Sequence, residues 1–142
     1  MILGRVLLFL LTFVSVLSFA EDQMYPEMVG VWQGNVRTVQ AGTEEVARGG
    51  MIVNEVKLKV TIEHQDGESF IGKSRSSAQS FDDPSAIVWG TIRSNGKEAI
   101  FVTSNGARGQ LWFMEPTKFE YCLTNKNDEL ATAYCAELSK TQ

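Results

Sequence analysis

Residues 55–67, EVKLKVTIEHQDG, contain the clearest structural pattern in this chain. Apolar and polar side chains alternate there at every second position, which predicts a β-strand with one face in a core and the other in water. A shift of one residue would bury two lysines, so the same pattern also predicts the register. The side chains expected to point inward are Val56, Leu58, Val60 and Ile62, and those expected to point outward include Lys57 and Lys59.

Turn signals follow this strand and recur along the chain. Asp66-Gly67 and Asn95-Gly96 favour tight hairpins, because both residue types accept positive φ, and Asn105-Gly106 is a third pair of this kind. No segment carries a convincing helical pattern. The predicted strands cover residues 29–39, 55–65, 69–75, 86–93, 98–103, 109–115, 119–124 and 132–138.

Eight short strands linked by hairpins predict an all-β fold. We expect a single antiparallel up-and-down β-barrel over residues 29–138. Two segments fit this pattern least well. Residues 40–51 are interpreted as a loop or as an extension of the neighbouring strands, and residues 76–85 as a loop over one end.

The first twenty residues have the layout of a secretory signal peptide. Arg5 precedes an apolar run over residues 6–19, and small residues lead to a cleavage site after Ala20. The alternative is an uncleaved membrane anchor. Cleavage leaves residues 21–142 as a single domain. We therefore expect a secreted or periplasmic protein that is not inserted in a membrane once the signal is removed.

Charge and cysteine content narrow the possible partners. Without Arg5 the chain has 12 Lys and Arg against 17 Asp and Glu, a net charge of −5. This balance argues against nucleic acid or an anionic membrane as a partner.

Cys122 and Cys135 are expected to form a structural disulfide in an oxidising compartment, with two free thiols as the alternative. If they face each other across a hairpin, Leu123 faces Tyr134.

A short motif on the first strand resembles a known family. Gly30-Val31-Trp32 is similar to the Gly-x-Trp signature of the calycin barrels, the lipocalins and avidins, and residues 61–72 resemble an avidin-type hairpin. The resemblance implies an eight-stranded barrel. The chain lacks a lipocalin-type helix and the tryptophan set of avidins, so biotin or retinoid binding is not carried over.

Four residues are candidates for ligand binding: Trp32, Trp89, Trp112 and Arg108. For Trp32 we favour a plug at the closed end of the barrel over a ligand contact. For Trp89 and Trp112, which lie among apolar neighbours, we favour core positions. Arg108 lies at a strand start, where an exposed turn position is favoured over a place at the barrel mouth.

The sequence carries no recognisable catalytic set, cofactor motif or metal site. His64 is the single histidine and lies beside a turn, and the adjacent carboxylates Glu44-Glu45 and Asp82-Asp83 are interpreted as solvated surface. We therefore expect an exported, non-enzymatic protein that holds a small apolar ligand in the barrel. The alternative is an extracytoplasmic interaction module, such as a hydrolase inhibitor, whose loops contact a protein.

Overall fold

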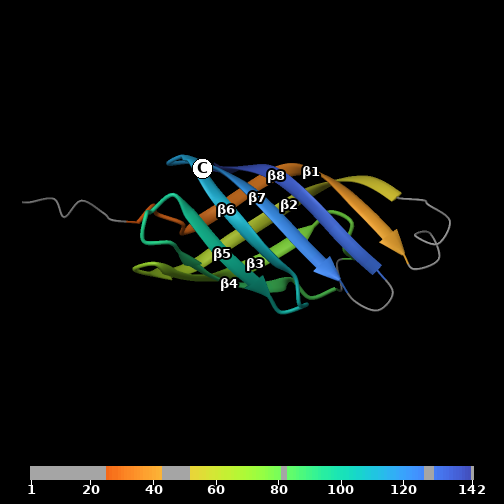
Figure 1. The fold of residues 1–142 in the computed structure, drawn as a ribbon, viewed down its shortest axis with the longest axis horizontal. Helices are drawn as coiled ribbons and strands as arrows, with labels where there is room; N and C mark the ends of the chain where they lie inside the picture. The colour runs from red at the N-terminus through yellow and green to blue at the C-terminus, as the bar shows by residue number, and fades with distance from the viewer. Residues whose placement is uncertain (1–24, 43–51, 81–82, 127–129, 142) are drawn as a thin grey trace, which may run out of the picture.

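The computed structural model describes residues 25–42, 52–80, 83–126 and 130–141. Each strand pairs antiparallel with the next, and the last pairs back with the first, so the sheet closes into a barrel (Figure 1). The fold is therefore the predicted all-β, up-and-down barrel. Among the described residues no helix is long and apolar enough to cross a membrane. The strands are β1 (Gly30–Gly42), β2 (Ile52–Asp66), β3 (Ser69–Ser76), β4 (Ala86–Ile92), β5 (Glu98–Thr103), β6 (Arg108–Glu115), β7 (Lys118–Lys126) and β8 (Leu130–Thr141).

Several strands are longer than their sequence patterns indicate, most clearly β1, β2 and β8. β1 continues to Gly42, β2 begins at Ile52, and β8 runs from Leu130 to Thr141. The end of β1 pairs with the start of β2 on one edge and with the start of β8 on the other. Residues 43–51 of the first predicted loop lie outside the described residues, as do the predicted signal peptide, Glu44-Glu45 and Asp82.

The predicted hairpin turns are present, but only their glycines take the left-handed conformation. Gly67, Gly96 and Gly106 have φ of 56°, 65° and 85°, while no other residue type in the described chain has positive φ. Gly96 N–H donates to the carbonyl of Arg93 and Gly106 N–H to that of Thr103, at 2.9 and 3.0 Å. Each of these two glycines thus comes directly after an ordinary turn, in a loop of four residues for Gly96 and of three residues for Gly106.

The predicted register of β2 is confirmed. Leu58, Val60 and Ile62 are buried in the core, Val56 is half-buried, and Lys57 and Lys59 are exposed. The predicted register of the last hairpin is also confirmed. Cys122 lies opposite Cys135, Leu123 opposite Tyr134 and Thr124 opposite Ala133, and the two cysteines form a disulfide.

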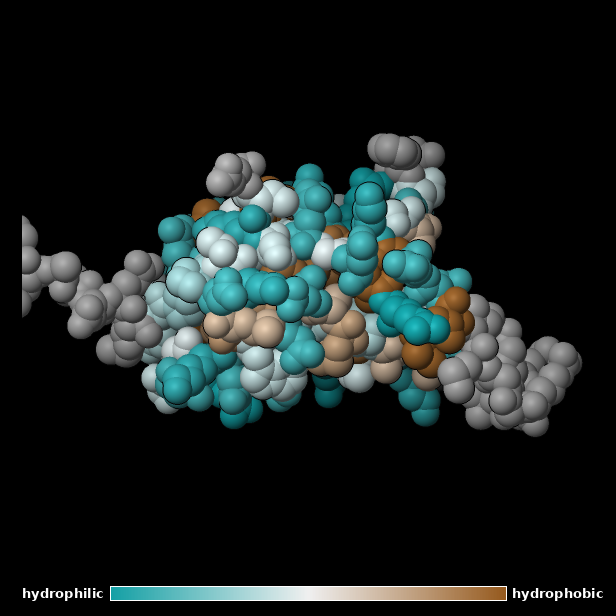
Figure 2. Space-filling view, turned by 90° about the horizontal axis from the view of Figure 1, so that it is seen from above, coloured by the Kyte–Doolittle hydropathy of each residue, from teal (hydrophilic) through white to brown (hydrophobic). Residues whose placement is uncertain are grey.

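The favoured core position of Trp89 is wrong. This side chain is 42% exposed on the outer face of β4, where it lies between Ile71 of β3 and Val102 of β5. β4 carries apolar residues on both faces, so its hydropathy does not indicate which side points inward. Trp112 is half-buried, and its neighbour Leu111 takes the core position. Figure 2 shows one outer face of the barrel, where hydrophilic side chains surround smaller apolar areas.

One end of the barrel is plugged by aromatic and apolar side chains. Trp32 is 1% exposed, and its ring centroid lies 4.5 Å from that of Phe119. The indole N–H of Trp32 donates to the carbonyl of Met28 at 2.8 Å, and the Met28 N–H donates to Gln65 Oε1 at 2.7 Å. These contacts hold the segment before β1 against this end, which lies at the left in Figure 1. We call it the closed end.

Candidate functional site

The inward face of the sheet changes from apolar to polar along the barrel axis. On β3 the inward side chains run from Phe70 near the closed end to Ser74 and Ser76 near the other end, and on β7 they run from Phe119 to Asn125. Because the strands are paired side by side, their polar ends meet at one level. We call this end the open end. Its inward polar residues are Thr38, Gln40, Asn54, Ser74, Ser76, Thr103, Asn125 and Thr132.

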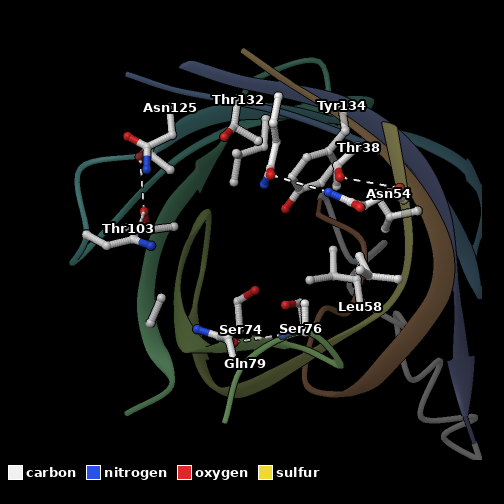
Figure 3. Close-up of a pocket in the computed structure, with 18 of the residues that line it drawn as sticks. Thr38, Asn54, Leu58, Ser74, Ser76, Gln79, Thr103, Asn125, Thr132 and Tyr134 are labelled. Carbon is white, nitrogen blue, oxygen red and sulfur yellow. Dashed lines mark hydrogen bonds between the residues drawn. The ribbon is translucent and has the colours of Figure 1, made fainter. Parts of the chain in front are cut away.

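A cavity of about 480 Å³ occupies the open end (Figure 3). Hydroxyl and amide groups share its lining with apolar side chains, among them Val36, Leu58 and Leu123. Glu55 is the single charged residue among the described residues of this lining. The described lining therefore suits a molecule with an apolar body and hydrogen-bonding groups, and it contributes no cationic side chain.

Hydrogen bonds between neighbouring strands order the polar rim. Thr38 Oγ1 donates to the carbonyl of Asn54 at 3.3 Å, and Asn54 Nδ2 donates to Gln40 Oε1 at 3.4 Å. On the opposite side, the backbone N–H of Ser76 donates to Gln79 Oε1 at 2.8 Å. Several rim side chains therefore already have hydrogen-bond partners within the protein.

Two tyrosines lie at the inner end of the cavity. The ring of Tyr121 stacks on Phe101, with centroids 4.6 Å apart, and lies 6.1 Å from the ring of Tyr134. Burial raises the pKa of Tyr121 well above 10, and the nearby Tyr134 raises it further. Burial also raises the pKa of Tyr134 to about 12, with the Tyr121 hydroxyl acting in the opposite direction. Both phenols are therefore protonated donors at neutral pH.

A row of alternating phenylalanine and glycine fills the middle of the barrel, at Phe70, Gly90, Phe101 and Gly109 on β3 to β6. A Cβ atom at Gly90 would lie 2.1 Å from Cζ of Phe70, and one at Gly109 would lie 2.2 Å from Cζ of Phe101. The two glycines thus let the rings lie flat against the neighbouring strand. Both rings are buried in the core, and neither lines the cavity.

None of the four ligand-binding candidates from the sequence lines the cavity. Trp32 lies at the closed end, Trp89 and Trp112 face outward, and Arg108 is exposed at the start of β6. Their role in ligand binding stays a prediction. Sequence reasoning did not select the cavity residues, although the alternation of β2 could have been extended back to Asn54 as an inward position.

The described residues hold no group of three His, Cys, Asp or Glu side chains that could bind a metal ion. His64 is exposed and pairs with Ile71 beside the turn between β2 and β3. That turn lies at the closed end, so the histidine and the cavity are at opposite ends of the barrel.

No family model and no curated protein matches this sequence. Among solved structures, a redesigned beta barrel superposes with a TM-score of 0.50 at 11% identity, covering 80% of this chain and 91% of that one. The likeness concerns the fold alone. A de novo designed fluorescence-activating beta barrel has a TM-score of 0.45 at 18% identity, covering 80% and 94%. A protein of unknown function from the DUF3598 family of Nostoc punctiforme has a TM-score of 0.49 at 10% identity, covering 80% and 47%.

Proposed function

We propose that this protein binds a small uncharged molecule in the open end of its barrel and catalyses no reaction on it. The observation that carries the proposal is the cavity of about 480 Å³, whose lining includes the ring of Tyr134 beside apolar and hydrogen-bonding side chains. Small-molecule sites commonly measure roughly 300–1,000 Å³. The opposite end of the barrel is filled by Trp32 and Phe119, so a ligand enters from one side.

The lining narrows the ligand class. A purely apolar ligand would leave several hydroxyl and amide groups without partners on binding, which costs free energy. The sequence indicated a small apolar ligand; the lining favours an apolar body that also carries hydrogen-bond acceptors or donors. The alternative is a protein-binding function through the loops at 40–51 and 76–85, of which residues 43–51 and 81–82 lie outside the described chain.

We place this function outside the cytoplasm. The disulfide between Cys122 and Cys135 is compatible with an extracellular or periplasmic location, and the predicted signal peptide at residues 1–20 would supply the export. The Gly-x-Trp tryptophan at the closed end supports kinship with the calycins. Both statements belong to the proposal.

Native mass spectrometry of the protein purified from its own host, without a denaturing step, tests the proposal. We expect a bound adduct that is lost in the variant Thr132→Trp, because the added indole fills the cavity. The matched control is Ala133→Trp, since the neighbouring residue is exposed on the outer face and should keep the adduct. An adduct that persists in Thr132→Trp would place the ligand elsewhere.

The absence of catalysis has its own test in His64. This side chain is exposed at the closed end, so His64→Ala is expected to leave the adduct unchanged. If His64→Ala removed a measurable turnover while the fold stayed intact, an enzymatic function would replace the proposed one.

A further inference from the structure

The hydroxyl of Tyr121 is unusual among the described residues, because it is their one fully buried side-chain polar atom without a hydrogen-bond partner. The residue is 1% exposed. Folded proteins pair nearly all such groups, since an unpaired buried donor lowers stability. This exception suggests that the hydroxyl has a hydrogen-bond partner that is not part of the protein.

The surroundings of this hydroxyl connect it to the cavity. Ser74 and Tyr134 both line the cavity, and both lie near enough to the Tyr121 hydroxyl to shift its pKa, Tyr134 upward and Ser74 downward, yet neither meets hydrogen-bond geometry with that hydroxyl. Ser74 is 8% exposed and lies on β3, whereas Tyr134 lies on β8. Figure 3 shows the ring of Tyr134 reaching into the cavity from the opposite wall to Ser74. Polar groups from β3, β7 and β8 thus converge at the inner end.

Resting on the proposed function, we infer that Tyr121, Tyr134 and Ser74 form an anchor that binds a carbonyl-type acceptor oxygen of a flat ligand. The two phenols keep their protons at neutral pH because burial raises both pKa values, so they act as donors. An acceptor satisfies them, and a neutral one suits a lining whose described residues include neither Lys nor Arg.

The shape of the ligand follows from the rings at the anchor. Tyr121 stacks between Phe101, at an interplanar angle of 19°, and Tyr134, at 25°. Because these rings are nearly parallel, a planar ligand in the cavity can stack on them. The ligand class is therefore a planar, uncharged molecule with one acceptor oxygen at its inner end.

A pair of isosteric probes isolates the anchor. We would compare 2-acetylnaphthalene with 2-isopropenylnaphthalene, which replaces the carbonyl oxygen by a methylene, in titrations followed by probe fluorescence. Tyr121→Phe should lower the affinity for the ketone by about five- to tenfold, which corresponds to the loss of one hydrogen bond. The affinity for the hydrocarbon should change by less than about twofold. Tyr25→Phe makes the same chemical change beside the closed-end core and should alter neither affinity.

Thermal unfolding of the ligand-free protein gives a second readout. Tyr121→Phe should raise the unfolding midpoint, because it removes an unpaired buried donor while keeping the ring. A lower midpoint would mean that the hydroxyl has a structural partner and would overturn the inference. Should Tyr121→Phe fail to fold, Ser74→Ala serves in its place, with a selective weakening of the ketone expected.

The possible failures are distinguishable. If neither probe binds the wild-type protein up to its solubility limit, the proposed function fails and the anchor fails with it. If both probes bind and Tyr121→Phe leaves the ratio of their affinities unchanged, only the anchor is overturned.

Discussion

The two ends of this barrel are built from the same eight strands but follow opposite rules. At the closed end Trp32, Phe119 and Leu138 are almost completely buried, and the indole N–H has its acceptor in the Met28 carbonyl. At the open end hydroxyls and amides face a cavity, and the hydroxyl of Tyr121 lies unpaired below it. The difference indicates that one end stabilises the fold and that the other is free to carry groups that packing alone would not select.

Removing the plug at the closed end should have the largest effect. Trp32→Ala deletes a fully buried indole and is expected to lower the free energy of unfolding by about 3–5 kcal/mol. Urea unfolding followed by tyrosine fluorescence and far-UV circular dichroism measures it. A loss below about 1 kcal/mol, as for a surface site, would mean that the closed end is not the stabilising half.

The disulfide tests whether the closed end holds the fold by itself. Cys122 and Cys135 close a loop with a sequence separation of 13, so reduction should cost about 3 kcal/mol by the chain-entropy model. Circular dichroism should still show the barrel, since the plug is untouched. A Cys122→Ala/Cys135→Ala variant supplies the control, because added reductant should not change its stability. Complete unfolding on reduction would assign the stabilising role to the hairpin instead.

Alkaline pH should lower the free energy of unfolding through Tyr134, which lies between the two ends of the barrel. An unfolded tyrosine loses its proton near pH 10, whereas burial raises the pKa of Tyr134 to about 12. Because the folded state holds this proton more tightly, stability is complete below about pH 10 and falls as the pH rises toward 12 and beyond. The loss should reach roughly 2–3 kcal/mol. Tyr134→Phe should make the alkaline loss of stability smaller, with the part that Tyr121 contributes remaining, and an unchanged profile would contradict the assignment.

A matched pair of substitutions on β1 locates the boundary. Val36 is fully buried and Thr38 is 6% exposed two positions further along the same inward face. Val36→Thr should cost about 1–3 kcal/mol, because it buries a hydroxyl among apolar side chains. Thr38→Val should cost less than about 1 kcal/mol, the value of its bond to the Asn54 carbonyl. Urea unfolding measures both losses of stability. Equal losses for the two substitutions would show that the polarity of the barrel interior does not change between these positions.

The sequence predicted the elements that local patterns specify. The alternation of β2 predicts its register, and the spacing of Cys122 and Cys135 predicts the pairing of the last hairpin, because both depend on residues close in the chain. Turns with Asn-Gly and Asp-Gly predict where strands end. The pairing of β1 with β8 joins distant segments and follows only from the analogy to closed barrels.

The cavity could not be predicted in the same way, because the residues that line it are of the polar types that usually lie on the solvent-exposed surface. Ser74 and Ser76 continue the inward face of Phe70, yet as serines near a strand end they look like surface. Trp89 misleads in the opposite direction, since it is a large apolar residue on the outer face. Burial inside a polar cavity and exposure of an apolar side chain both depend on the closed sheet, which hydropathy alone does not describe.

The seam between β1 and β8 differs from the other strand pairs in the length of chain that it spans. Thr141 Oγ1 donates to the carbonyl of Val31 at 3.1 Å across 110 positions of chain, whereas the other strand pairs are neighbours in sequence. The hairpins can form one after another as the chain lengthens, while β1 keeps an unpaired edge until β8 arrives. Thr38 of β1 and Tyr134 of β8 face the same cavity. The two walls of the proposed site that carry Thr38 and Tyr134 therefore come together only in the closed barrel, and a chain without β8 lacks this arrangement.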